Sequence, residues 1–311
     1  MIRLDLALIR DYPGMSRRKA RDVIEKGQVT VAGQTVREAG RMVAEGAAIA
    51  FDPSRPALPR ARSSLPILHQ DDAVLVVDKP AGLLTVATVP GAEDEDTAQA
   101  RAEDYVRHLR PGNSYLGIVH RIDRDTSGAV AFALTPTARE RLRALFRAHR
   151  IERRYLALVR GQPGGEGGAI DMPLHEAYRT GRRRIARPGE PSRPALTRYR
   201  VLERFPGAAL LELELGTGRQ HQIRVHLAHL GTPVLGDPVY GAGGGGPSLP
   251  KIRRQMLHAR LLAFEHPLTG AEVRAESPLP EDFTRALAHL RRQRGRASPG
   301  GSPTGPRRGP S

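Results

Sequence analysis

Three prolines within seven residues interrupt the chain in the segment DPSRPALP, at positions 52–59. Each proline removes a backbone N–H and disfavours a helical residue before it, so neither a helix nor a central strand can pass through. The 311 residues must therefore build separate hydrophobic cores on either side. We predict a head at 1–53, a linker at 54–66 and a body at 67–290. The remaining 291–311, rich in Gly, Pro and Ser, is predicted to be a disordered basic tail.

The charge balance narrows the function classes. The chain has 49 Lys+Arg against 33 Asp+Glu, a net charge of +16, and most of the excess lies in 178–200 and 291–311. Such a protein is expected to bind polyanions, nucleic acid above all, although a GC-rich genome also produces an arginine bias. The absence of cysteine excludes disulfides, thiolate nucleophiles, zinc–thiolate sites and iron–sulfur clusters.

Membrane association is not expected from the sequence. No segment approaches the ~18 apolar residues of a transmembrane helix. The N-terminus MIRLD carries charges where a signal peptide would need an apolar run. We therefore expect a cytoplasmic protein with no membrane partner.

The head shows a helix and a strand pair. Ser16 is a typical N-cap for a helix that Gly27 ends, and strands are expected at 28–31 and 48–51 around an Ala32–Gly33 turn. The stretch RLDLALIRDYPGMSRRKARDVIEKGQVTVAGQ resembles the S4 RNA-binding module; the alternative is a generic small α/β segment with a solvated basic helix. The resemblance implies an RNA-binding surface made of Arg17, Arg18, Lys19 and Arg21.

A dense group of ionisable residues, HRIDRDTSG at 120–128, lies in the body between the apolar stretches 117–119 and 129–134. We expect the loop to lie between two buried strands, a position typical of reactive loops. A carboxylate beside arginines can act as a nucleophile or a base, and residue types alone leave Asp123 and Asp125 both open.

This motif is similar to the HRLD-x-x-TSG motif of the RluA-type pseudouridine synthases. The resemblance implies that Asp123 is the catalytic residue and that His120 and Arg121 contact RNA or the neighbouring strand. The stretch IERRYLALVRG at 151–161 resembles the family's basic-x-Tyr strand, which implies that Tyr155 stacks on the target uracil; ordinary core packing is the alternative for this tyrosine.

Three further stretches match in family order. GTGRQHQIRVHLAHLG at 216–231 and GDPVYG at 236–241 resemble the TGR-x-HQIR-x-H and GDP-x-YG segments, and LHARLLAFEHP at 257–267 resembles the closing strand. In the family an arginine of this region pairs with the catalytic aspartate. The resemblance implies that Arg224 has this role and that Arg219 lies nearer the RNA backbone.

The implied fold is α+β: a mixed, mostly antiparallel central sheet with flanking helices and a catalytic cleft, preceded by a small S4-like α/β RNA-binding domain. The implied function is isomerisation of uridine to pseudouridine in RNA, with large-subunit (23S) ribosomal RNA as partner. No cofactor or metal is expected, and the protein is expected to be a monomer. The alternatives are the same chemistry on tRNA and a non-catalytic RNA-binding ribosome-assembly factor.

Three other patterns each allow a functional and a plainer explanation. His221, His226 and His229 could suggest a metal-dependent nuclease, but no cysteine and no HExxH pattern accompany them. The run GAGGGG at 241–246 satisfies G-x-G-x-x-G but precedes a proline, so we predict a flexible loop and no nucleotide cofactor. The basic cluster expected to contact RNA, unless it is merely solvated, consists of Arg182, Arg183 and Arg184.

Overall fold

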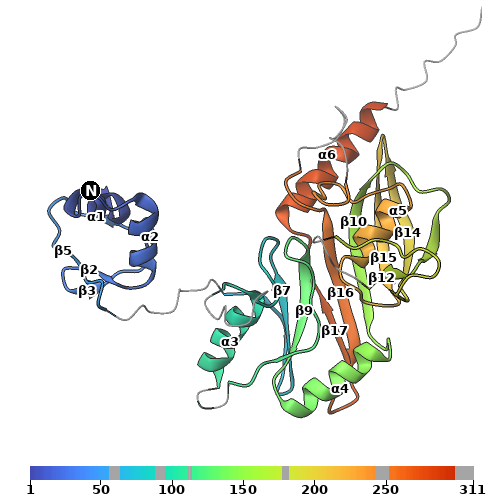
Figure 1. Cartoon of the computed structure of the whole chain (residues 1–311), viewed down its shortest axis with the longest axis horizontal. Coiled ribbons are helices and arrows are strands. Elements are labelled where there is room, and N and C mark those ends of the chain that lie inside the picture. The colour runs from blue at the N-terminus through green and yellow to red at the C-terminus, as the bar shows by residue number, and fades with distance from the viewer. Residues whose placement is uncertain are drawn as a thin grey trace, which may run out of the picture. The chain divides into compact units, whose positions relative to one another are not determined.

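The computed structural model describes residues 1–55, 64–87, 95–110, 112, 114–176, 182–241 and 252–297. These residues divide into two compact units, one containing the head and the other beginning at Leu65 (Figure 1). The run at 242–246, where we predict a flexible loop, lies outside the described residues, as does most of the predicted linker.

The head is a small α/β unit whose local structure follows its sequence. It contains β1 (Ile2–Arg3), α1 (Leu4–Asp11), α2 (Arg17–Glu25), β2 (Val29–Val31), β3 (Gln34–Thr35), β4 (Met42–Val43) and β5 (Ile49–Phe51). The Ser16 hydroxyl caps α2 by accepting from Lys19 N at 3.2 Å. Ala32 and Gly33 both have positive φ, as a two-residue hairpin turn between β2 and β3 requires.

The body is built on a ten-stranded sheet in the order β11–β14–β15–β10–β16–β9–β7–β6, with β17 beside β16 and β8 beside β9. Its strands are β6 (Ile67–Gln70), β7 (Val74–Lys79), β8 (Gly117–Ile118), β9 (Ser127–Ala133), β10 (Glu152–Arg160), β11 (Gly167–Asp171), β14 (Leu196–Phe205), β15 (Ala208–Leu215), β16 (Leu257–Glu265) and β17 (Glu272–Glu276). β16 and β9 pair in parallel, and the other pairs are antiparallel. The predicted α+β class with a mixed, mostly antiparallel sheet is confirmed.

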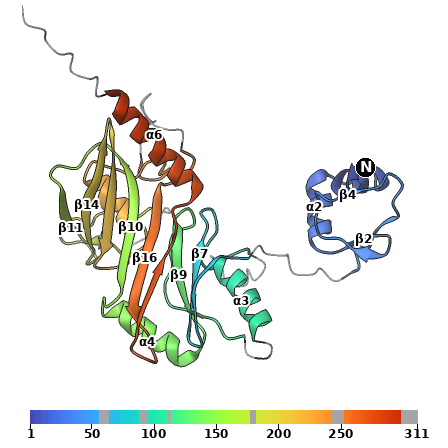
Figure 2. The ribbon, with the colours of Figure 1, turned by 180° about the vertical axis from the view of Figure 1, so that it is seen from behind.

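Helices cover both faces of this sheet. α3 (Ala98–Leu109) and α5 (Gln222–His229) pack on the face that includes Leu75 and Val77. α4 (Pro136–Arg147) packs against Val74 and Val76, and α6 (Glu281–Ala297) against Phe205. Successive side chains of β7 point to opposite faces of the sheet, so the apolar residues of this strand are buried on both faces. Figures 1 and 2 show α4 and α6 at opposite ends of the sheet. A separate two-stranded ribbon is formed by β12 (Leu174–His175) and β13 (Ser192–Arg193).

Two expectations need correction. The reactive loop does not lie between two buried strands: β9 is buried throughout, but β8 has two residues and Ile118 is 36% exposed. The tail does not begin at 291, because α6 continues to Ala297. Leu290 at its inner face is fully buried, and Arg291 pairs with Glu203 on β14, so packing and charge extend the helix beyond the predicted boundary.

No described helix is both long and apolar enough to span a membrane.

Candidate functional site

The loop that carries Asp123 is attached to its surroundings by buried polar groups. On one side, the Thr85 hydroxyl donates to Ile122 O at 2.8 Å and accepts from Ile122 N at 3.2 Å. Lys79, whose side chain is fully buried, donates from Nζ to Arg124 O at 2.8 Å, and also to Pro80 O and Leu83 O. Burial lowers the pKa of Lys79 to about 7.

On the other side, residues just before β16 hold the same loop. Arg254 donates to Asp125 O at 3.0 Å while it forms an ion pair with Asp282. Gln255 Nε2 donates to the Thr126 hydroxyl at 2.8 Å. The backbone on both flanks of Asp123 is therefore held by contacts from distant segments, as a preorganised site requires.

The Asp123 carboxylate belongs to a chain of charges. Arg224, on α5, donates from Nη1 to Asp123 Oδ2 at 3.0 Å and from Nε and Nη2 to both oxygens of Asp237, at 2.7 and 2.9 Å. Burial would lower the pKa of Arg224, but the two carboxylates raise it. Burial would likewise raise the pKa of Asp237, and the hydrogen bonds and charge of Arg224 lower it. Arg224 is therefore held charged and fixed against Asp123.

Asp237 is itself held by the turn that follows it. Its Oδ1 accepts from the backbone N–H groups of Val239 and Tyr240, at 2.8 and 3.0 Å. The Tyr240 ring lies over the guanidinium of Arg224, with 5.0 Å from Cζ to the ring centroid. The Tyr240 hydroxyl lies 2.9 Å from His221 Nδ1, and His221 Nε2 lies 4.0 Å from Asp123 Oδ1. Burial lowers the pKa of His221, which favours its neutral form.

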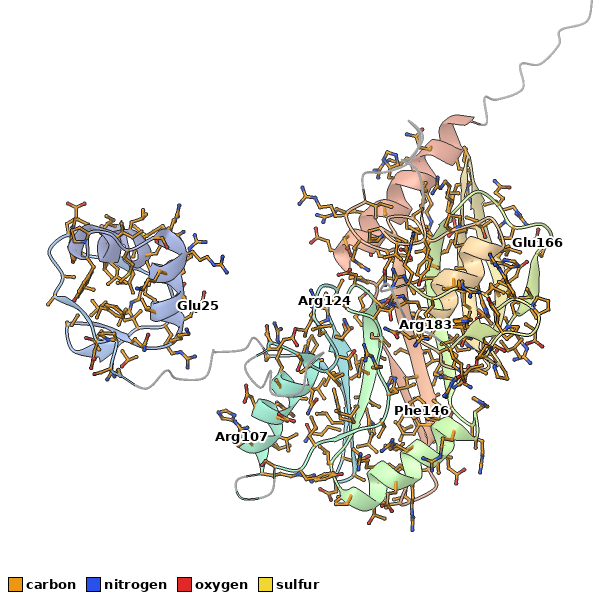
Figure 3. All side chains as sticks on the ribbon, in the orientation of Figure 1. Glu25, Arg107, Arg124, Phe146, Glu166 and Arg183 are labelled. Atoms are coloured by element: carbon orange, nitrogen blue, oxygen red, sulfur yellow. The ribbon has the colours of Figure 1, made fainter. Side chains whose placement is uncertain are left out.

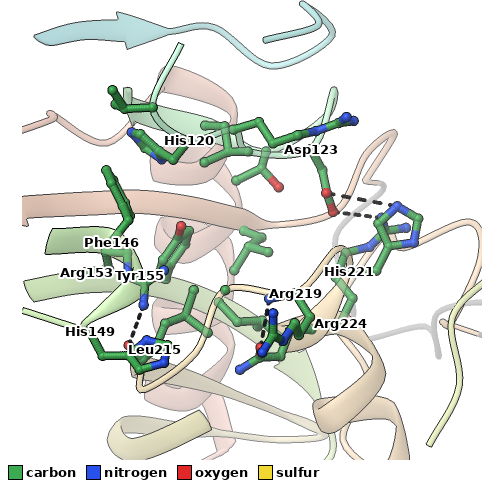
Figure 4. A pocket seen from close by; sticks show the side chains of 18 of the residues that line it. His120, Asp123, Phe146, His149, Arg153, Tyr155, Leu215, Arg219, His221 and Arg224 are labelled. Carbon is green, nitrogen blue, oxygen red and sulfur yellow. Dashed lines mark hydrogen bonds and ion pairs between the residues drawn. The ribbon is translucent and has the colours of Figure 1, made fainter. Parts of the chain in front are cut away.

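These groups surround a cavity of about 500 Å³ (Figure 4), a volume within the usual range for small-ligand sites. Tyr155 lines it from β10 and is 8% exposed. Burial raises the pKa of Tyr155 to about 12, so its phenol is neutral at physiological pH. A flat, neutral ring and a fixed carboxylate thus face one space.

The cavity wall is strongly basic. Six arginines line it, and Asp123 is the one carboxylate among its described lining residues. The arginines are Arg121, Arg143, Arg147, Arg153, Arg219 and Arg224. In the part of the chain that the structure describes, Arg224 is the one of these six that forms an ion pair. Arg219 donates from Nε to Pro194 O at 3.2 Å.

His120 lies in the cavity wall, but its protonation state is set by the fold. Its ring stacks on Phe146 at 4.6 Å, and its Nε2 accepts the backbone N–H of Ala131 at 2.9 Å. Burial, with the nearby charge of Arg153, lowers the pKa of His120 to about 3. His120 is therefore a neutral group that braces the loop.

The six cavity residues expected from the sequence, Asp123, Tyr155, Arg224, Arg121, Arg219 and His120, all line this one space. The cluster at 182–184 does not line it and is engaged within the protein. Arg184 forms an ion pair with Glu190, Arg182 donates to Val239 O, and Arg183 donates to Gln220 Oε1 before α5. Figure 3 shows Arg183 and Phe146 in different parts of the body.

The four basic residues expected to bind RNA in the head fall into two pairs. Arg17 and Arg21 donate to Asp5, whose side chain is fully buried. Burial would raise the pKa of Asp5, but hydrogen bonds from arginines lower it to about 2. Arg18 and Lys19 are exposed on the same helix and form no ion pair among the described residues.

Several residues of the site have contacts that the sequence alone does not predict. Asp237 and Tyr240 lie in the GDPVYG stretch that was matched, but nothing local in the sequence shows that they contact Arg224. Arg143 and Arg147 are one turn apart on α4, which a helical pattern could have placed on one face. Only the folded chain shows that this face borders the cavity.

The histidines considered as metal ligands lie among other partners. His226 is fully buried, with its two ring nitrogens at hydrogen-bond distance from the Thr197 hydroxyl and Met172 O. Over the described residues, no group of three or more potential ligands is placed to hold a metal ion.

Comparisons with known proteins agree on one family. Residues 73–229 match the family described as RNA pseudouridylate synthase, and residues 2–49 match the S4 domain. The chain is 36% identical to ribosomal large subunit pseudouridine synthase D of Xanthomonas campestris pv. campestris, over 95% of this chain and 91% of that one. It is 36% identical to the protein of that name from Pseudomonas aeruginosa, over 94% and 93%. The solved structure of human RNA pseudouridylate synthase domain containing 4 matches with a TM-score of 0.59 and 26% identity, over 72% of this chain and 92% of that chain.

Proposed function

The chain belongs to the RNA pseudouridylate synthase family and isomerises uridine to pseudouridine in RNA; we propose that its substrate is large-subunit ribosomal RNA and that Asp123 is the nucleophile. The observation that carries the site assignment is the fixed Asp123 carboxylate, paired with Arg224 at 3.0 Å in a cavity that Tyr155 also lines. The ribosomal target is supported by the names of the two bacterial relatives, which cover nearly the whole chain.

In the proposed reaction, a uridine leaves the RNA stack and enters the cavity. The Asp123 carboxylate forms a bond to ribose C1′ or to uracil C6, and the bond between C1′ and N1 breaks. The freed base turns until C5 faces C1′. The C5–C1′ bond then forms, Asp123 is released, and the hydrogen on C5 leaves as a proton while N1 gains one. The isomerisation is balanced because no atom or electron is transferred to a second molecule.

The other residues have positioning roles in this proposal. Arg224 orients the carboxylate of Asp123, because Nε and Nη2 of its guanidinium are held by hydrogen bonds to Asp237. Tyr155 stacks on the base through its rotation, an interaction worth ~1–3 kcal/mol that tolerates either face of the ring. Arg121 and Arg219 contact the RNA backbone at the cavity, and His120 braces the loop.

Two further features follow from the same proposal. One copy of the chain supplies Asp123, Tyr155 and Arg224, so we propose that a monomer is active. The exposed Arg18 and Lys19 on α2 add RNA affinity from the S4 unit, and a ribosomal substrate implies that the protein works in the cytoplasm.

The test is Asp123→Asn, compared with Asp125→Asn as a matched neighbour on the same loop. Asp123→Asn is expected to lower pseudouridine formation by about 10³-fold or more with RNA binding retained, and Asp125→Asn to stay active. Pseudouridines are mapped in ribosomal RNA and tRNA from a deletion strain complemented with each variant. An active Asp123→Asn protein would contradict the assignment of the nucleophile, and sites lost from tRNA alone would contradict the ribosomal target.

A further inference from the structure

Two adjacent arginines on β10 have opposite surroundings. Arg154 is half-exposed and pairs with Glu152 at 2.5 Å and with Glu212 at 3.8 Å. Arg153, on the other face of the strand, is 7% exposed and lines the cavity. Among the described residues no carboxylate lies within 4.0 Å of its guanidinium.

The donors of Arg153 are only partly used. Nη2 donates to Leu215 O at 3.1 Å, whereas Nε is buried and has no hydrogen-bond partner (Figure 4). The guanidinium lies by the Phe146 ring, 5.8 Å from Cζ to the centroid. A Cβ at Gly218 would lie 2.5 Å from Nη1, so the absence of a side chain at Gly218 leaves room for the charged group. Packing therefore holds Arg153 in place without neutralising it.

A buried charge without a counter-ion is costly, and an anion that enters the cavity would remove this cost. Burial lowers the pKa of Arg153, because the charged guanidinium loses its contact with water. Arg143 and Arg147 line the same cavity from α4, both exposed and both without a carboxylate partner among the described residues. Among the described lining residues a single carboxylate, Asp123, opposes this wall, and it is already paired with Arg224. The wall is suited to bind a polyanion.

The position of Arg153 relative to Tyr155 indicates which anion. Residues two apart on a strand share a face and lie about 7 Å apart, and the burial along β10 keeps this alternation. One nucleotide can therefore place its base against Tyr155 and a phosphate against Arg153. We propose that Arg153 binds the phosphate adjoining the flipped uridine, with Arg147 guiding the RNA backbone toward it. This inference rests on the proposed function, because the phosphate belongs to the RNA substrate.

The experiment couples a change in the protein to a change in one phosphate. A short RNA substrate is prepared with a methylphosphonate, which removes one negative charge, at each phosphate around the target uridine in turn. The wild-type protein is expected to lose about 10- to 100-fold in kcat/KM at one phosphate adjoining the uridine, the range for a hydrogen bond between charged groups. Arg153→Met should be slower on the unmodified RNA and should lose nothing further at that phosphate.

Arg154→Met is the matched control, because it removes a neighbouring arginine from the opposite face of β10. It should keep the wild-type loss at the same phosphate. Arg153→Lys keeps a positive charge without the planar fork and should show a smaller loss than the wild type; it remains the decisive variant if Arg153→Met does not fold. A purely structural role for Arg153 would leave the methylphosphonate loss unchanged in either variant.

Two results would overturn the inference. They are an equal methylphosphonate loss in wild type and in the Arg153 variants, or no sensitive phosphate next to the target uridine in the wild type. Failure of the proposed function is separate, since the wild-type protein would then form no pseudouridine in the unmodified RNA.

Discussion

Arg224 forms hydrogen bonds with two carboxylates that have different roles. Asp237 accepts from Nε and Nη2 and has backbone partners of its own, so it fixes the guanidinium, and Asp123 accepts from the third nitrogen, Nη1. The position of the Asp123 carboxylate therefore depends on a residue that does not itself line the cavity.

Asp237→Asn should show this dependence. Removing one partner of a buried ion pair costs about 3–5 kcal/mol of stability, and the loosened Arg224 should lower kcat more than it changes KM for RNA. Thermal unfolding and steady-state kinetics measure the two effects. Glu265→Gln, which removes an exposed partner of Arg150, is the control and should change neither by much. An unchanged kcat in Asp237→Asn would show that Arg224 keeps its position without this anchor.

Because Lys79 is buried, we expect the stability of the folded protein to depend on pH. Its pKa is about 7 in the folded protein and about 10.4 in an unfolded chain, so between these values the unfolded state binds the additional proton. Its contribution to stability therefore rises with pH across that window, by up to about 1.4 kcal/mol per pH unit, and is lost as pH falls toward 7.

The measurement is urea unfolding at several pH values between 7 and 10 for wild type and Lys79→Met. Methionine has similar length but no ionisable group, so the difference in unfolding free energy between the two proteins should change with pH. Parallel curves would mean that Lys79 has an ordinary pKa despite its burial.

At the level of elements, the backbones of β9 and β16 approach each other very closely next to the site. Gly128 has a φ of +118°, and a Cβ there would lie 2.2 Å from Ala259 O, a backbone atom that cannot move aside easily. This glycine is the last residue of the loop that carries Asp123 and makes the two-residue parallel pairing possible.

Gly128→Ala should therefore destabilise the protein by several kcal/mol, because backbone strain and a steric clash act together. Gly207→Ala is the control: its φ of +71° is also positive, but nothing lies within 4 Å of an added Cβ. Its cost should be near 1 kcal/mol. Equal unfolding free energies for the two variants would contradict the close approach of β9 and β16.

Local patterns predicted elements well where the determining contacts are local. The Ser16 cap, the Ala32–Gly33 turn and the apolar run of β7 depend on residues a few positions apart. The contact between Arg224 and Asp123 joins residues 101 positions apart, and no spacing rule reaches that far without a family resemblance. The missing counter-ion of Arg153 and the burial of Lys79 likewise exist only after distant strands have met. The predicted start of the tail at 291 was wrong, because the composition of this segment does not show that Leu290 packs in the core.

For the whole molecule, the net charge of +16 overstates the free positive surface. Many arginines of the 178–200 stretch pair with glutamates, including Arg193 with Glu176 and Arg200 with Glu212. Five arginines that form no ion pair among the described residues line the cavity, namely Arg121, Arg143, Arg147, Arg153 and Arg219. We therefore expect RNA affinity to depend on few of the many basic residues.

The S4 unit offers a direct test of this distribution. Arg18→Ala combined with Lys19→Ala should lower the slope of log K against log salt concentration by about 1 to 2, since each phosphate contact contributes ~0.7–0.9. Fluorescence anisotropy with ribosomal RNA fragments measures it. Arg285→Ala, which removes an arginine paired with Glu281 on α6, should leave the slope unchanged. An unchanged slope in the double variant would show that α2 does not contact RNA through these residues.

The central position of β16 in the sheet has a consequence for folding during translation. β16 begins at residue 257 and lies between β10 and β9, which are made more than ninety residues earlier. Until β16 is made, the facing edge of β10 and the part of the β9 edge that β8 does not cover have no partner. Such open edges can pair with the wrong strand. The loop that carries Asp123, which Arg254 and Gln255 hold in place, also stays unanchored on that side. The enzyme can thus acquire its activity only after β16 has been made.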